Sequence, residues 1–366
     1  MENEKYSYMQ RLFFRCQNHK QTRENCVNAM FEMESEVRKR YAGLNIVDEN
    51  EEAAKVKLLE MILVDGCFII ELLYKNYKRS TSTHMIIDSI LDNYSMKSAV
   101  QHDLIRLENQ IPFFILDKLF SLTVKTIDQF SLRECIFLFF KAMMGLPGIP
   151  KLDLEIMPLH ILSFLHSCYV PWNDDSSLGT EQIKLKYSAT QLDLAGVKFK
   201  PAGFEMNLFN VNFYTDHSCF QVFRSSCFEI PPYQTFLSNL IAFEQFSPVR
   251  KRHFTSHAFL INKLINTTKE VDLLIEAGVI HNYLGSSEEV ARLYNNVCKN
   301  VYVGSFYFTE TCSQVTGYCN RFWPRCLAKL RRDYFGNPWT GISVLAAISI
   351  FVLTLLQTIY TLRSYN

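Results

Sequence analysis

Asp65 has the surroundings closest to those of a catalytic acid in this sequence. It lies in the stretch Leu58–Leu73, where twelve of sixteen residues are apolar, so we expect its side chain to be shielded from water. A shielded carboxylate can hold a proton at neutral pH and act as a proton carrier. A structural role, with the carboxylate paired or hydrogen-bonded, is commoner. We favour that role for Asp65 and keep the residue as a functional candidate.

Glu108 is the second candidate carboxylate. It begins the polar triplet Glu108, Asn109 and Gln110, which is followed by an apolar run that contains Pro112. A proline that breaks a helix leaves backbone groups without partners. Since the triplet can supply those partners, we interpret the segment as a structural junction.

Two histidines, His253 and His257, have the i, i+4 spacing of a metal-binding pair. Phe254 stands where a zinc protease would carry its glutamate, and no third ligand can be assigned. The eleven cysteines form no C-x-x-C pair and are expected to be free thiols in a reducing compartment. We interpret both histidines as helix-surface residues and predict no metal, no cofactor and no catalytic residue, although an enzyme with a dispersed site stays open.

The composition excludes several classes of protein. The chain has 366 residues, with 38 Lys and Arg against 37 Asp and Glu, so a net charge of +1 provides no field that would attract nucleic acid. The apolar fraction of 48% is that of a folded chain, and thirteen glycines leave little room for phosphate-binding loops. We therefore predict a folded body that binds no nucleic acid.

Helix starts are marked along most of the chain. Four pairs have the capping-box spacing, and Gly278 is placed as a helix C-cap. The pairs are Ser98 with Gln101, Ser131 with Glu134, Thr267 with Glu270, and Ser286 with Glu289. These signals predict a predominantly α-helical body over residues 1–335.

A β-rich insertion is expected at about 186–232. Apolar and polar residues alternate from Val197 to Phe199, from Phe204 to Leu208 and from Val211 to Phe213, which predicts three strands. We expect a small antiparallel sheet, which makes the fold class α+β. The polar segment 173–180 before it is the best candidate for an internal boundary.

The C-terminal segment 339–360 contains no charged residue, and its 22 residues would span roughly 33 Å as a helix. Trp339 and Tyr360 fall where the two membrane interfaces would lie. The sequence therefore predicts one C-terminal transmembrane helix followed by a short tail, 361–366. A buried core helix is the alternative.

Basic residues precede this segment, and the positive-inside rule places the body in the cytosol of a single-pass, tail-anchored protein. The sequence does not separate plasma membrane from endomembrane. It shows no secretory signal, so we interpret the sequons at Asn93 and Asn266 as chance occurrences. An apolar seam from Phe308 to Cys326 is compatible with a homodimer or with packing inside the body. The basic residues are Arg321, Arg325, Lys329, Arg331 and Arg332, which could also bind anionic lipid headgroups.

Six segments carry motifs that resemble those of one plant family. They are VDGCFIIEL at 64–72, LENQIPFF at 107–114, AGVKF at 195–199, LIAFEQ at 240–245, LGSSEEV at 284–290 and RDYFGNPW at 332–339. The chain resembles the family catalogued as domain of unknown function 247, also called uncharacterised protein family 0481.

The resemblance implies a plant protein with one C-terminal membrane anchor and no established catalytic residues, and some grass members of the family are associated with self-incompatibility loci. Family members usually begin with a further segment containing an I-G-P-F-H-H-G-like motif, which does not occur here. A shortened member or a start other than Met1 would explain the difference.

Three functions are consistent with these observations. The first is a membrane-tethered recognition or signalling module that binds a protein partner, with the β insertion as its contact surface. The second is an enzyme with a dispersed site that includes Asp65 or Glu108. The third is a lipid-responsive scaffold that works through the basic residues.

Overall fold

The computed structural model forms two compact units that alternate along the chain. Unit 1 comprises Met1–Ser176 and Ser226–Arg250, and unit 2 comprises Ser177–Ser225 and Lys251–Asn366. The segment 173–180, expected to be a boundary, lies outside the described residues. The structure describes residues 2–41, 51–81, 86–146, 156–170, 185–202, 209, 211–214, 219–223, 233–247, 252–282, 284–334 and 338–364.

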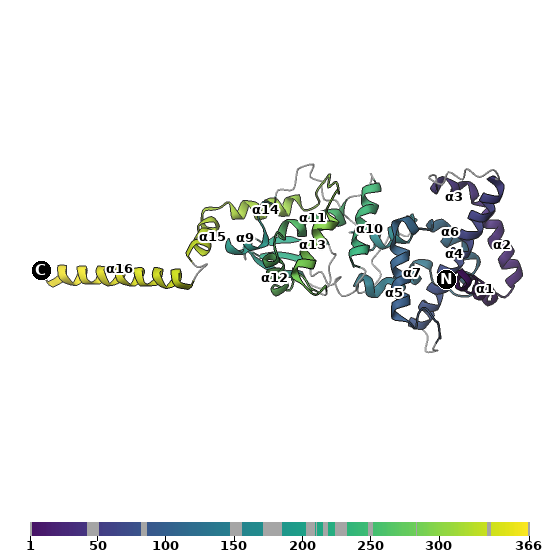
Figure 1. The fold of residues 1–366 in the computed structure, drawn as a ribbon, viewed down its shortest axis with the longest axis horizontal. Coiled ribbons are helices and arrows are strands. Elements are labelled where there is room, and N and C mark those ends of the chain that lie inside the picture. The colour runs from purple at the N-terminus through teal and green to yellow at the C-terminus, as the bar shows by residue number, and fades with distance from the viewer. Residues whose placement is uncertain are drawn as a thin grey trace. The chain divides into compact units, whose positions relative to one another are not determined.

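Unit 1 is helical in its described residues and is organised around one long helix, α4, which contacts α1, α2, α6 and α7. Figure 1 colours this unit purple to teal, except for the green α10. Its helices are α1 Glu2–Arg15, α2 His19–Glu32, α3 Glu34–Arg40, α4 Glu51–Thr81, α5 Tyr94–Ile105, α6 Phe113–Leu122, α7 Leu132–Met144, α8 Ile161–Ser167 and α10 Tyr233–Phe246, with short 3-10 turns at Leu107–Asn109 and Val124–Thr126.

The sequence of α4 explains its central place. Its apolar side chains are buried on several sides of the helix, including Ile62, Phe68 and Leu72, as expected for a helix enclosed by neighbours. A Cβ atom at Gly66 would lie 2.8 Å from Leu119 Cδ1 of α6. The absence of a side chain at this position therefore lets the two helices approach closely.

Charged groups are also buried beside α4. Asp88 is buried and accepts hydrogen bonds from the Tyr8 hydroxyl at 2.7 Å, from Lys75 Nζ at 2.8 Å and from the Ile90 and Leu91 amides at 3.0 Å. Burial by itself would raise the pKa of Asp88, but the hydrogen bonds and the Lys75 charge outweigh it and lower the pKa. The carboxylate therefore stays ionised inside the unit.

The network includes a second buried carboxylate, Glu71, which lies on α4 one turn before Lys75. Glu71 receives Arg15 in a bidentate pair, with Nη2 2.8 Å from Oε1, and its Oε1 lies 3.7 Å from Lys75 Nζ. Lys75 Nζ also lies 4.2 Å from the centre of the Tyr8 ring. Two cations thus neutralise two anions between α1, α4 and the segment that follows α4.

Unit 2 combines helices with one small sheet. Its elements are α9 Ala189–Leu194, β1 Lys198–Ala202, β2 Asn212–Tyr214, β3 Cys219–Phe223, α11 His253–Leu264, α12 Thr268–Glu276, α13 Ser287–Val297, α14 Thr309–Cys319, α15 Phe322–Tyr334 and α16 Pro338–Ser364. The expectation of a mostly helical body is confirmed.

The sheet differs from the antiparallel one expected. Its strand order is β1-β3-β2, in which β2 and β3 pair antiparallel but β1 and β3 pair parallel. The register sets Phe220 opposite Phe199 on one side and Phe213 on the other. Alternating apolar and polar residues identify a strand but not the strand it pairs with. The predicted antiparallel pairing of all the strands is therefore wrong. The expected strand from Phe204 to Leu208 lies outside the described residues.

Three of the four expected helix starts are confirmed. Ser131 and Thr267 form complete capping boxes, and Ser286 accepts a hydrogen bond from the Glu289 amide. Gly278 follows α12 with a φ of +71°, as expected for a C-cap. The prediction at Ser98 is wrong. There α5 begins earlier, because the Asn93 side chain accepts from the Met96 amide and caps the helix.

The predicted transmembrane helix is not supported. The segment is helical, as α16, but none of the helices in the described residues is both long and apolar enough to cross a bilayer.

We expect Lys75→Met to lower the free energy of unfolding by about 3 to 5 kcal/mol, because it leaves two buried carboxylates short of a cation. Lys55→Met is the matched control on the same helix, since Lys55 makes only a 3.5 Å surface pair with Glu52, and it should change the free energy by less than about 1 kcal/mol. Urea unfolding measures both. Equal losses in the two variants would contradict the structural role of the network.

Gly196→Ala should destabilise unit 2. Gly196 has a φ of +89°, and an added Cβ would lie 3.3 Å from Leu327 Cδ2 of α15, so we expect a loss of about 1 to 3 kcal/mol. Gly317→Ala is the control, because Gly317 is helical and nothing lies within 4 Å of its Cβ position. It should stabilise by about 0.5 to 1 kcal/mol. Thermal unfolding of both variants tests whether the two changes have opposite signs.

Candidate functional site

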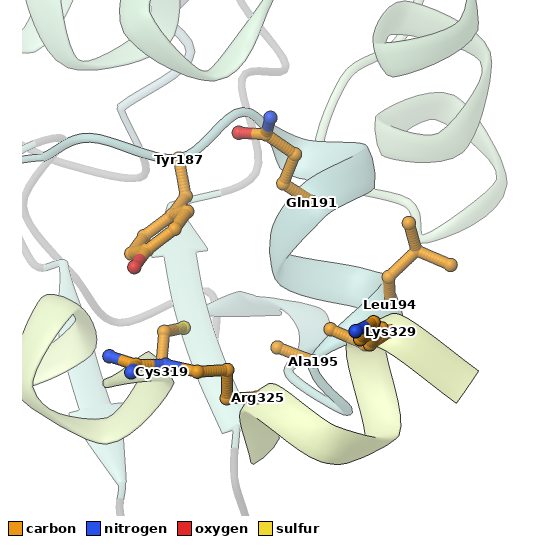
Figure 2. Close-up of a pocket in the computed structure, with 8 residues that line it drawn as sticks. Tyr187, Gln191, Leu194, Ala195, Cys319, Arg325 and Lys329 are labelled. Carbon is orange, nitrogen blue, oxygen red and sulfur yellow. The ribbon is translucent and has the colours of Figure 1, made fainter. Parts of the chain in front are cut away.

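A groove in unit 2 lies between α9 and α15, with a cavity volume of about 300 Å3 (Figure 2). Figure 2 shows Tyr187 and Gln191 at the α9 side and Arg325 and Lys329 on α15. The lining residues are Tyr187, Gln191, Leu194, Ala195, Cys319, Arg325, Ala328 and Lys329. Both walls belong to the same unit.

The α9 wall is held by one buried carboxylate. Glu270, in the first turn of α12, accepts hydrogen bonds from Thr190 Oγ1 at 2.6 Å and Ser188 Oγ at 3.1 Å. Its other oxygen accepts from the amide and the hydroxyl of Thr267. Ser188 is the N-cap of α9 and forms a capping box with Gln191. Glu270 therefore joins the N-termini of α9 and α12.

The ionisation of Glu270 follows from these donors. Burial alone would raise its pKa, but the hydrogen bonds from Thr190, Thr267 and Ser188 outweigh burial and lower it. The capping box between Thr267 and Glu270 is visible in the sequence. The contribution of Ser188 and Thr190 is not, because nothing in the spacing places two residues about 80 positions earlier beside Glu270.

The α15 wall presents two cations to the groove. Arg325 and Lys329 are exposed, are separated by one helical turn, and make no ion pair with any residue that the structure describes. Asn320 Oδ1 accepts a hydrogen bond from the Tyr187 hydroxyl at 3.0 Å and lies 3.4 Å from Arg325 Nη2. The guanidinium is thus tethered at one nitrogen, and its other donors remain available.

The rest of the groove provides aliphatic surface and one unreactive thiol. Leu194, Ala195 and Ala328 supply aliphatic surface. Burial raises the pKa of the Cys319 thiol to about 11, so the thiol is protonated at neutral pH and is a poor nucleophile. The groove is suited to binding a group that is apolar at one end and anionic at the other.

Unit 1 contains a buried acid–histidine pair that the sequence reasoning missed. His166 Nε2 lies 2.9 Å from Glu244 Oε1, and the two residues are 1% and 0% exposed. The rings of His160 and His166 each meet the edge or face of Phe243 at 5.2 to 5.4 Å. Glu244 occurs in the LIAFEQ motif, but no spacing rule connects it to His166, 78 residues away. The pair is closed to solvent and holds α8 against α10.

The two carboxylates singled out in the sequence belong to unit 1, whereas the groove residues belong to unit 2. Asp65 is partly buried and forms an ion pair of 2.6 Å with Lys5 of α1. Glu108 is exposed in the 3-10 turn after α5. Neither is brought together with a nucleophile in the contacts described here.

The residues after Glu108 act as the junction that the sequence indicates. Asn109 Nδ2 donates to Asp103 O at 3.0 Å, and Gln110 Nε2 donates at 2.7 Å to the carbonyls of Leu104 and Arg106. The other atom of the Gln110 amide accepts from Leu162 N at 3.1 Å. Asn109 and Gln110 therefore cap the end of α5, and Gln110 ties it to α8.

His253 and His257 are not surface residues, so that prediction is wrong. Both are buried on the inner face of α11, and burial lowers the pKa of His257 to about 4. Neither ring nitrogen of His257 has a hydrogen-bond partner among the described residues. The error arose because i, i+4 spacing defines a shared face of a helix but not whether that face is inward. Within the described part of the chain no three metal-ligating side chains are grouped.

The structure describes the side chains of three of the six residues expected at a membrane interface. Arg325 and Lys329 line the groove, and Tyr360 is exposed on α16. The side chains of Arg331, Arg332 and Trp339 lie outside the described residues.

Comparison with known proteins identifies a family and two relatives. Residues 1–353 match the family model of domain of unknown function 247, described as plant protein of unknown function. A UPF0481 protein of Arabidopsis thaliana is 26% identical over 365 residues, which cover 93% of this chain and 74% of that protein. A putative UPF0481 protein of the same plant is 30% identical over 177 residues, 46% of this chain and 32% of that protein. No solved structure matches significantly.

His257 should make the stability of the protein depend on pH. Its folded pKa of about 4 lies below the unfolded value near 6.5, so the unfolded chain binds a proton that the folded chain excludes. Stability is complete above pH 6.5 and falls as the pH drops toward 4, by on the order of 3 kcal/mol. We expect His257→Leu to remove this loss without weakening the protein at pH 7. Urea unfolding at several pH values tests it, and parallel curves for the two proteins would contradict it.

Proposed function

The chain belongs to this family of plant proteins of unknown function, and we propose that it is a recognition protein that binds a protein partner through the groove between α9 and α15. The observation that supports this most directly is the pair of cations, Arg325 and Lys329, that face a concave apolar surface without an ion-pair partner among the described residues. Binding sites are typically concave and mostly apolar, with a few polar groups that fix orientation.

The size and chemistry of the groove favour binding over catalysis. A volume of about 300 Å3 accommodates one or two side chains of a partner rather than a large cofactor. The lining residues include no carboxylate and no histidine that would serve as a general base, and the Cys319 thiol is protonated. The alternative of an enzyme rests on Asp65, which pairs with Lys5, or on Glu108, and neither lines the groove. The pair His166 and Glu244 is buried, so solvent does not reach it.

A photo-crosslinking experiment tests the proposal. The photoreactive residue p-benzoyl-L-phenylalanine replaces Leu194 at the edge of the groove, and in a control protein it replaces Lys299, which is exposed elsewhere in unit 2. After irradiation in plant extract, we expect a discrete set of proteins attached at position 194 and not at position 299.

The same experiment is repeated with Arg325→Glu and Lys329→Glu added to the protein with the photoreactive residue at position 194. These substitutions lie on an exposed face and should leave the circular dichroism spectrum unchanged, while the cross-linked set disappears. Identical products from both positions, or products that persist in the charge-reversed protein, would refute recognition through the groove.

A further inference from the structure

We propose that the groove recognises an acidic peptide segment with the local pattern acidic–aliphatic–acidic. The inference rests on the proposed function and specifies the chemistry of the partner. The two acidic side chains pair with Arg325 and Lys329, and the aliphatic side chain between them contacts Leu194 and Ala195 on the opposite wall.

Charge complementarity is the first argument. Arg325 and Lys329 are four residues apart on α15 and therefore lie on one face of it, and Arg321 immediately precedes the helix. Arg321 lies with its guanidinium carbon 6.0 Å from the centre of the Tyr318 ring. None of the three has an ion-pair partner among the residues that the structure describes. A partner that carries carboxylates would supply the missing counter-charge.

The tether on Arg325 is the second argument. Asn320 Oδ1 accepts hydrogen bonds from the Tyr187 hydroxyl at 3.0 Å and from Arg325 Nη2 at 3.4 Å, which restricts the Arg325 side chain. A guanidinium held in this way loses less conformational entropy on binding. Its free edge matches a carboxylate in a bidentate pair. Asn320 is therefore a positioning residue for Arg325.

The spacing supplies the sequence pattern of the partner. Residues four apart on a helix have Cβ atoms about 6 Å apart, and residues two apart on an extended peptide are separated by about 6.6 Å on the same side. Two acidic residues separated by one residue therefore reach both cations. The residue between them points the other way, toward the aliphatic α9 wall.

The concave shape favours a peptide over a lipid surface. The planar array of anionic headgroups in a membrane can meet exposed cations but cannot place an apolar group between two helices of one unit. A free phosphate would contact the cations and leave the aliphatic wall without a partner. An extended peptide can pair with the cations of one wall and contact the aliphatic residues of the other wall at the same time.

Fluorescence anisotropy tests the inference on the full chain. The probe is a fluorescein-labelled peptide with Glu-Leu-Glu at its centre and Gly-Ser repeats on either side. Comparison peptides carry Gln-Leu-Gln or Glu-Ser-Glu. We expect saturable binding of the first, at least about tenfold weaker binding of both comparison peptides, and affinity that falls as salt is raised.

Variants assign the effect to the groove. Arg325→Gln should weaken the Glu-Leu-Glu peptide at least about tenfold, whereas Lys299→Gln, which removes an exposed cation elsewhere in unit 2, should not. Asn320→Asp should also weaken the peptide, because the new carboxylate competes for Arg325, while urea unfolding of this variant stays close to that of the parent. A purely structural role for Asn320 would instead lower stability and leave the ratio between the Glu and Gln peptides unchanged.

The outcomes separate this inference from the proposed function. The acidic-peptide inference would be overturned if the Glu and Gln peptides bound equally, or if the Arg325 and Lys299 variants lost the same affinity. Binding to phosphatidylserine-containing vesicles that the Glu-Leu-Glu peptide does not displace would also overturn it. If charge-dependent cross-links form at position 194 but the peptide does not bind, the groove recognises a protein partner and the acidic–aliphatic–acidic pattern is refuted. If the peptide binds but cross-links do not form, the recognition of a protein partner falls.

Discussion

A carboxylate that is removed from water must receive hydrogen bonds or a counter-charge, and this constraint organises both units. In unit 1 Asp88 and Glu71 collect donors from α1, from α4 and from the segment after α4. In unit 2 Glu270 takes four hydrogen bonds from the starts of α9 and α12. Helices far apart in sequence are therefore fixed by the groups that a buried acid requires, in addition to the apolar surface they share.

The groove inherits its geometry from this arrangement. Glu270 holds the first turn of α9, and Gly196 ends the helix in a conformation that lets Leu327 of α15 come close. The positions of the walls that carry Leu194 and Arg325 are thus set by contacts of residues that do not line the groove. A binding surface supported in this way keeps its shape before a partner arrives, which reduces the entropy lost on binding.

Local signals predicted much of the fold, and long-range partners were the part that failed. The caps at Ser131, Thr267 and Ser286 depend on atoms within three residues, so their sequence spacing was sufficient. The pairing of β1 with β3 and the inward face of His257 depend on segments distant in the chain, and no periodicity encodes them. The expected transmembrane helix is also not supported, since none of the helices in the described residues is long and apolar enough to cross a bilayer.

Arg325 and Lys329 show how the meaning of a residue depends on what faces it. In the sequence they belong to a basic cluster next to an uncharged segment, and that neighbourhood favours an interpretation as topology signals. The structure places the same two side chains across a cavity from Leu194 and Ala195, residues more than 120 positions earlier. A cation beside aliphatic surface in a concavity can serve as a recognition element, since one ligand can pair with the charge and cover the apolar wall. The two charges are visible in the sequence, but their position opposite aliphatic residues of the groove is visible only in the fold.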